Sequence, residues 1–228
     1  MPSVQKSLFF ISSALVTAKA VGVLGYAMST QWAIMTMKCV GGGSGSFNGS
    51  ATITLALFNG KLDKVQCPFG NSDNFQVFPE LVKIGGSPVA LHGLVLCLLV
   101  LCLLFSAGTI LISLYNSVSN PYETYMGPIG IYTCSSLSAC LSFVVLIIFV
   151  ASVTVTSMAE DMVKNSDQTV ELDDKSTEMQ LGYYLVIPYT VLSLAAIALI
   201  FMYDHAAYTH RREQQRPTEE APKEIMMY

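Results

Sequence analysis

Residues 32–67 read WAIMTMKCVGGGSGSFNGSATITLALFNGKLDKVQC and lie between two long apolar segments. They include the only tryptophan of the chain, Trp32, two cysteines, Cys39 and Cys67, and the only N-glycosylation sequon, which begins at Asn48. Cysteines outside apolar segments and a glycan acceptor are typical of a loop in an oxidising compartment. This stretch therefore predicts a loop on the outer side of a membrane.

The composition of the whole chain indicates a membrane protein. Of its 228 residues, 52% are hydrophobic and 12% are charged, and the mean hydropathy is +0.52. These values differ strongly from those of soluble domains. The net charge of −4 and the absence of a basic patch with interleaved aromatic residues argue against nucleic acid as a partner.

Four apolar segments are long enough to cross a bilayer, which takes about 20 residues of helix. Basic residues counted over whole loops do not decide the orientation, although near the span ends the three arginines of the tail favour the cytoplasmic side. The sequon and the cysteine pair in the first loop decide it, so both termini are predicted to be cytoplasmic. The predicted order is N-terminus 1–6, span 7–28, outer loop 29–88, span 89–115, cytoplasmic loop 116–128, span 129–152, outer loop 153–180, span 181–203 and tail 204–228. We therefore expect a membrane all-α fold, a four-helix bundle of the plasma membrane with a small extracellular antiparallel β-sheet in the first loop.

The first span has a second interpretation, as a secretory signal peptide. Lys6, the apolar run Leu8–Val16 and the tripeptide Ala18-Lys19-Ala20 match the three parts of such a peptide. The apolar run continues past the cleavage site to Met28, which favours a transmembrane helix. Both interpretations leave the next loop outside.

Lys19 is the only charged residue inside an apolar segment, and the other three segments contain no acidic residue to pair with it. By helix rise it lies about 13 Å from the outer end of its span and about 18 Å from the inner end. It is either a structural lysine that extends its ammonium toward the outer interface or part of an ion or ligand site in the bundle. We expect the structural role. On the same helix Ala14, Ala18 and Gly22 recur every four residues and form a face that permits close helix contact.

The first loop has the residue content of a small antiparallel sheet. Ile34–Val40 and Thr52–Phe58 are rich in strand-forming residues, and Asn59-Gly60 is a strong hairpin signal. Cys39 and Cys67 are the natural disulfide pair, because the other four cysteines lie in apolar segments, where a thiol packs as a small hydrophobic group. On the chain-entropy model this bond contributes about 3.5 kcal/mol of stability.

Three further segments carry weaker signals. Phe75–Ile84 has the pattern of a short amphipathic helix at the membrane surface. The second outer loop, 153–180, has seven acidic residues without the spacing of a calcium loop, and we interpret it as a solvated acidic face. Pro188 is expected to kink the fourth span.

The order of these features resembles the clarin family over the whole chain. The matching motifs are LFNG at 57–60, FPELVK at 78–83, NPYET at 120–124 and GPIGIY at 127–132, in addition to Trp32, Cys39 and the sequon. Within the family, residues 115–122 and the charged tail resemble the third paralogue. Clarins are similar in layout to claudins, so the resemblance implies a claudin-like bundle with an extracellular sheet. The claudin Gly-Leu-Trp before Cys39 is absent, and the claudin pore or junction function is therefore not carried over.

Two classes of function remain. The first is a non-enzymatic organiser of membrane or adhesion complexes, and the resemblance implies a role in sensory cells, at the hair bundle or synapse. The alternative is a transport component, either a pore or a channel or transporter accessory subunit, for which Lys19 is the only hint. A pore should show several polar or charged residues facing inward, and these spans contain one charge. We expect neither enzyme activity nor a cofactor or metal, because His92, His205 and His210 lack partner residues at ligand or catalytic spacing.

The C-terminal residues Met226, Met227 and Tyr228 are a candidate docking motif. Apolar side chains at the last and third-from-last positions, next to a free carboxylate, suit a PDZ-type groove. The alternative is an unstructured end with no ligand. The expected partners are thus the lipid bilayer, other membrane proteins, and a PDZ-domain or cytoskeletal scaffold at the C-terminus.

Overall fold

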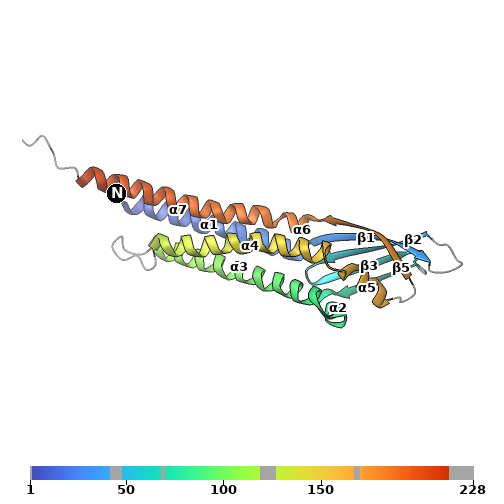
Figure 1. Ribbon diagram of the computed structural model, residues 1–228. Coiled ribbons are helices and arrows are strands. Elements are labelled where there is room, and N and C mark those ends of the chain that lie inside the picture. The colour runs from blue at the N-terminus through green and yellow to red at the C-terminus, as the bar shows by residue number, and fades with distance from the viewer. Residues whose placement is uncertain (1, 42–47, 68–69, 119–126, 167–169, 216–228) are drawn as a thin grey trace, which may run out of the picture.

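A computed structural model describes residues 2–41, 48–67, 70–118, 127–166 and 170–215. Long helices form an elongated bundle, and a curved sheet lies at one end of it (Figure 1). The elements are α1 (Pro2–Ser29), β1 (Gln31–Gly41), β2 (Asn48–Ala56), β3 (Asn59–Val65), β4 (Asn71–Gln76), α2 (Val77–Ile84), α3 (Ser87–Val118), α4 (Gly127–Thr154), α5 (Met158–Ser166), β5 (Val170–Met179), α6 (Leu181–Tyr184) and α7 (Val186–Gln215). The predicted four-helix bundle with a small antiparallel sheet is confirmed.

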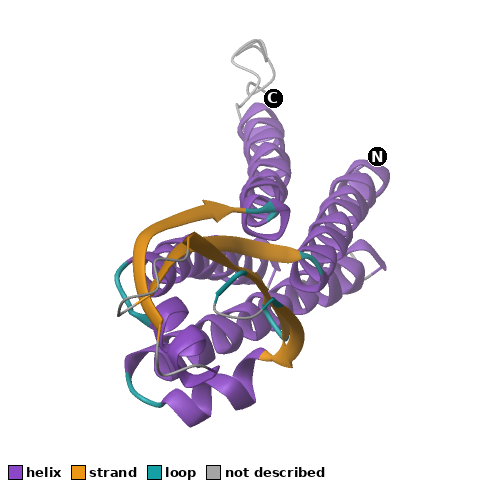
Figure 2. Cartoon of the chain, turned by 90° about the vertical axis from the view of Figure 1, so that its right-hand side faces the viewer, coloured by secondary structure: helices purple, strands orange, loops and turns teal. Residues whose placement is uncertain are grey.

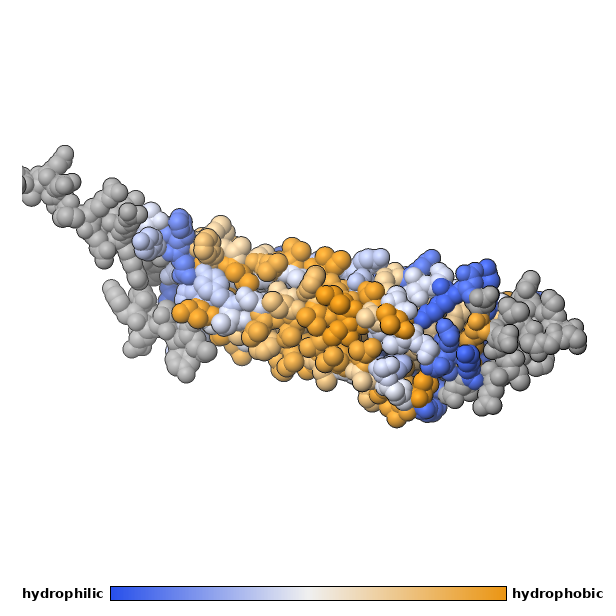
Figure 3. Space-filling view, in the orientation of Figure 1, coloured by the Kyte–Doolittle hydropathy of each residue, from blue (hydrophilic) through white to orange (hydrophobic). Residues whose placement is uncertain are grey.

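Four helical segments are long and apolar enough to cross a membrane: Val4–Ser29, Ser87–Val118, Gly127–Thr154 and Leu181–Ala206. Hydrophobic residues cover the middle of the bundle, and hydrophilic ones gather toward its two ends (Figure 3). Helix α1 packs against α3 and α7, and α4 packs against the same two helices. α1 is one continuous helix from Pro2 to Ser29.

One residue, Leu185, separates α6 from α7 near the sheet end of the fourth span. Its backbone keeps right-handed helical dihedral angles, and its N–H donates to the carbonyl of Leu181 at 2.9 Å. Pro188 lies three residues later and has no N–H to donate to the carbonyl of Tyr184, so the helical ladder loses a bond at this point. The irregularity at Leu185 therefore lies next to the proline that was expected to kink this span.

The sheet has five antiparallel strands in the order β4-β3-β2-β1-β5. From Ala33 onward every second side chain faces inward, as strand geometry requires, and this buried set on β1 and β2 is Ala33, Met35, Met37, Cys39, Ala51, Ile53 and Leu55. Trp32 is also buried, next to an irregularity in the pairing of β1 with β2. Helices α2 and α5 and the ends of the bundle complete this core. Viewed from the sheet end, the strands curve over the helices (Figure 2).

The second loop contributes more structure than the sequence analysis predicted. Residues 158–166 form α5, and residues 170–179 form β5, which pairs with β1. The sheet is therefore assembled from two segments that are far apart in the chain, one between the first and second membrane-capable helices and the other between the third and fourth. On β5 the described acidic side chains, Asp174 and Glu178, are exposed, whereas Leu172 and Thr177 are half-buried. The interpretation as a purely solvated face therefore missed a strand.

The hairpin between β2 and β3 turns slightly earlier than predicted. Leu55 pairs with Gly60, so Asn59 and Gly60 begin β3, and the turn itself contains Leu57 and Phe58. Gly60 has a packing role instead, because a Cβ there would lie 2.3 Å from the ring of Phe75 on β4. The ring of the cross-strand neighbour fills the space above the glycine.

Candidate functional site: the sheet and its junction with the bundle

Trp32 joins the sheet to the bundle. Its side chain is fully buried, and its indole N–H donates a 2.8 Å hydrogen bond to the carbonyl of Ala27 at the end of α1. Its ring meets that of Phe149 on α4 edge to face, with centroids 4.9 Å apart. A Cβ on Gly182 would lie 2.5 Å from the indole, so α6 also packs directly on the ring. One side chain thus fixes β1 against three of the membrane-capable segments.

Two further hydrogen bonds hold the sheet in place. The backbone N–H of Gln180 donates to the carbonyl of Trp32 at 2.8 Å, which ties the end of β5 to β1. The Nε2 of His92, near the start of α3, lies 2.9 Å from the carbonyl of Leu57 in the β2–β3 turn. A carbonyl only accepts, so Nε2 carries the proton here. His92 therefore anchors the far side of the sheet to the bundle.

Cys39 and Cys67 are joined in a disulfide, with Cα atoms 5.7 Å apart and both side chains buried. The bond links β1 to the residues that follow β3, across β2. The strand between them approaches closely, because a Cβ on Gly49 would lie 2.1 Å from the carbonyl oxygen of Gln66. The other four cysteines, which lie on α3 and α4, are free.

Of the remaining predicted site residues, only Lys19 has a described side chain, and it lies apart from this junction. Lys19 is exposed on the outward face of α1 and does not line the bundle interior. Asn48 is the first residue of β2, where its backbone pairs with Val40, and its side chain is outside the described part of the structure. The C-terminal residues Met226, Met227 and Tyr228 lie outside the described residues.

A side-chain hydrogen bond joins the edge strand β4 to β3. The Ser72 hydroxyl donates to Asp63 at 2.6 Å, and Lys61 lies 2.9 Å from the same carboxylate. These two hydrogen bonds, Ser72 first, lower the pKa of Asp63 below its usual value. The side chains of residues 71–74 are exposed. Among the described strands β4 has only one neighbour, so its outer edge presents polar backbone that can pair with another chain.

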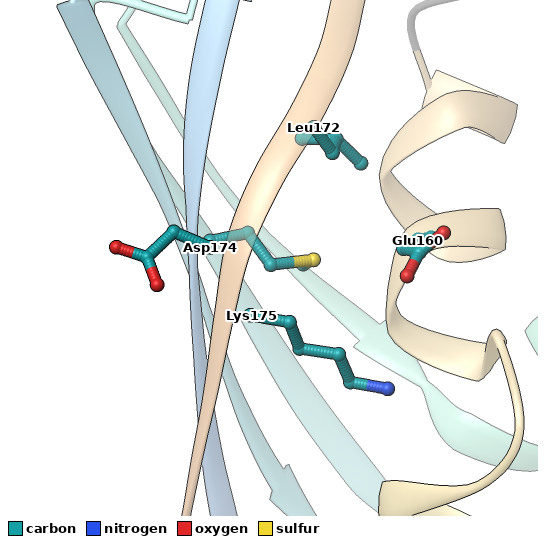
Figure 4. A pocket seen from close by; sticks show the side chains of 5 residues that line it. Glu160, Leu172, Asp174 and Lys175 are labelled. Carbon is teal, nitrogen blue, oxygen red and sulfur yellow. The ribbon is translucent and has the colours of Figure 1, made fainter.

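A cavity of about 150 Å³ lies between β5 and α5 (Figure 4). It is lined by Met37, Glu160, Leu172, Asp174 and Lys175. The ammonium of Lys175 donates to the carbonyl of Thr156 at 3.1 Å. The carboxylate of Asp174 points away to the other side of β5, where Lys38 binds it and lowers its pKa. These charges therefore stabilise the sheet and do not form a catalytic pair across the cavity.

The centre of the bundle is filled by a tyrosine that sequence analysis did not single out. Tyr189 on α7 is fully buried, and its hydroxyl donates to the carbonyl of Cys102 at 3.1 Å. Because the hydroxyl proton of Tyr189 is donated to Cys102, the hydroxyls of Ser106, at 2.8 Å, and Ser138 donate to the tyrosine oxygen. Serine and threonine recur at helical spacing on the spans, as in Ser135, Ser138 and Ser142, and this pattern is the signal that predicts an inward polar face.

The sequence and the fold can now be compared with known proteins. A family model described as Clarin-2-like matches residues 4–200. The chain belongs to the clarin family. This clarin is 30% identical to Clarin-3 of Homo sapiens over 232 residues and 31% identical to Clarin-3 of Mus musculus over 233, with 100% of each chain covered. It is 28% identical to Clarin-1 of Homo sapiens over 198 residues, which cover 82% of this chain and 83% of that protein. The family recognised from the sequence motifs is confirmed, and the four membrane-capable helices make this clarin a multi-pass membrane protein.

Proposed function

We propose that this clarin is a non-enzymatic organiser that holds partner proteins in a plasma-membrane complex, with its sheet outside and both termini in the cytoplasm. Clarin membership supports a sensory-cell role of the hair-bundle or synapse kind. The observation that carries the proposal is the sheet: it is braced by a disulfide, fixed to the bundle by Trp32 and His92, and exposed along β4. A rigid sheet with a polar edge is a surface for other proteins, because an extended segment can add to it as a further strand.

The centre of the bundle favours an organiser over a pore. A conducting pathway needs polar groups around an open passage. In this clarin the hydroxyls of Ser106 on α3 and Ser138 on α4 are hydrogen-bonded to the hydroxyl of Tyr189 on α7, which also bonds the carbonyl of Cys102. The buried tyrosine ring occupies the middle of the bundle, where a passage would have to run. If this clarin instead serves as a channel or transporter accessory subunit, the conducting pathway therefore belongs to the partner protein.

Co-purification from native sensory membranes tests the organiser function. Partner membrane proteins are expected with the wild type and are expected to fall at least about tenfold in Asp73→Lys, which reverses a charge on the exposed edge strand. Lys164→Glu on α5 is the matched control, since it also reverses an exposed charge but lies away from that edge. Equal partner recovery from all three proteins would contradict docking at β4.

The outer position of the sheet predicts that Asn48 carries a glycan. Enzymatic deglycosylation is expected to increase the gel mobility of the wild type and to leave Asn48→Gln and Ser50→Ala unchanged, because each of these variants removes the sequon. No mobility shift in wild-type protein at the cell surface would contradict the proposed sidedness.

We also propose that the C-terminus docks a cytoplasmic scaffold through Met226, Met227 and Tyr228. A peptide of the last ten residues is expected to bind members of a PDZ-domain panel, with the terminal carboxylate held by backbone donors. The same peptide without Tyr228, and one amidated at its end, are expected to bind at least about tenfold more weakly. Equal binding by the three peptides, or binding by none, would remove the carboxylate-capture mechanism.

A further inference from the structure

The outward face of α1 carries a charge in the middle of the hydrophobic belt. Lys19 is exposed on this face, and no hydrogen bond or ion pair holds it within the described residues. Fifteen residues separate it from Val4 and ten from Ser29, which places its backbone about 22 Å and about 15 Å from the two ends of the segment. An ammonium at this depth is costly unless it meets an opposite charge.

The described part of the chain supplies no carboxylate at the depth of Lys19 in the bundle. The four membrane-capable segments contain a single acidic residue, Asp204, which lies near the opposite end of the bundle from the sheet and accepts a 2.8 Å hydrogen bond from Tyr132. A second copy of this clarin would bring another lysine to the same depth and no acid to meet it. The positive charge of Lys19 therefore favours a different protein, one with an acidic residue at this depth, as the neighbour of α1.

Small residues next to Lys19 allow a helix to approach closely. Ala18, Gly22 and Gly25 are exposed on the same side of α1, and a Cβ on either glycine would meet nothing within 4 Å. Ala14, in contrast, is buried inside the bundle. Of the small face predicted from the sequence, only Ala18 and Gly22 therefore lie on the outward side of the helix. Small residues at such a surface let two helix backbones come close within a membrane.

We infer that the outward face of α1 around Lys19 docks a transmembrane helix of another membrane protein that carries an aspartate or glutamate at the depth of Lys19. The carboxylate would pair with the ammonium, and the partner helix would lie along Ala18, Gly22 and Gly25. This surface is separate from the sheet and the tail, so a negative result here leaves the proposed docking at β4 untouched.

Energy transfer in phosphatidylcholine vesicles tests this inference on the full-length protein. The probes are two synthetic leucine-rich transmembrane peptides that each carry an acceptor dye. One peptide has Asp at the depth of Lys19, and the other has Leu there. The Asp peptide is expected to associate about tenfold more tightly than the Leu peptide with the wild type. This difference is expected to vanish in Lys19→Leu, and Lys19→Glu is expected to prefer a Lys peptide instead.

Two controls separate docking on α1 from a general attraction between charges. Gly22→Leu keeps the lysine but fills the small face, and it is expected to weaken association of the Asp peptide. In the double variant Lys19→Leu/Val100→Lys the charge moves to an exposed position on α3, and the preference for Asp is not expected to return. Equal association of the Asp and Leu peptides with the wild type, or full recovery in the double variant, would overturn the inference.

Discussion

Replacing Trp32 with alanine is expected to lower the free energy of unfolding by about 3–5 kcal/mol, the usual cost of truncating a buried aromatic side chain. The loss is large because the ring is fully buried, packs edge to face on Phe149 and donates a hydrogen bond to Ala27. A domain is stable by only about 5–15 kcal/mol, so most of the margin disappears. Circular dichroism in lipid nanodiscs measures the effect, since the variant has no tryptophan left to report by fluorescence.

Phe58→Ala is the matched control for this variant, because that ring is 53% exposed in the β2–β3 turn and its removal is expected to cost under about 1 kcal/mol. Near-equal stability of Trp32→Ala and Phe58→Ala would show that the sheet does not depend on Trp32.

The same junction can be tested from the side of α6. In Gly182→Ala the new methyl group would lie 2.5 Å from the indole and 2.8 Å from the Gln31 carbonyl, and we expect the free energy of unfolding to fall by about 1–3 kcal/mol.

The sequence predicted the bundle well because its signal is strong. Each predicted span lies inside or almost inside an observed helix, since about 20 apolar residues have few alternatives to a membrane helix. The helix ends were less accurate: α7 continues to Gln215, beyond the predicted boundary at residue 203, because polar residues such as those after Asp204 remain good helix formers. Hydrophobicity marks where a helix meets lipid and not where it ends.

The sequence predicted the sheet only in part. β1, β2 and β3 were predicted from local strand content and a nearby turn signal, but β4 and β5 were not. The expected helix over Phe75–Ile84 overlaps the end of β4, and the acidic residues of β5 resemble a solvated loop. The place of β5 in the sheet comes from pairing with β1, more than 120 positions away in the chain, and a local pattern does not reveal such pairing. The contacts of Trp32 with Gly182 and of His92 with Leu57 were missed for the same reason.

Removing the disulfide is expected to cost about 3.5 kcal/mol in the double variant Cys39→Ser/Cys67→Ser, because the unfolded chain regains the freedom of a long loop. For a chain of this size the melting temperature should fall by about 10 °C. The sheet core has little volume of its own, so the loss should appear first as opening of β1 from β2 and β3. Melting in nanodiscs, with and without reductant, measures the change.

The free cysteines supply the control for this experiment. Cys97 and Cys140 are exposed on α3 and α4, so the double variant Cys97→Ser/Cys140→Ser changes the same number of sulfur atoms without touching the sheet. It is expected to melt like the wild type and to lose about 10 °C in reductant, as the wild type does. The variant without the disulfide is expected to be insensitive to reductant. Two results would show that the bond between β1 and the end of β3 does not brace the sheet. The first is a wild-type melting temperature that reductant leaves unchanged, and the second is labelling of Cys39 by a thiol reagent in the unreduced protein.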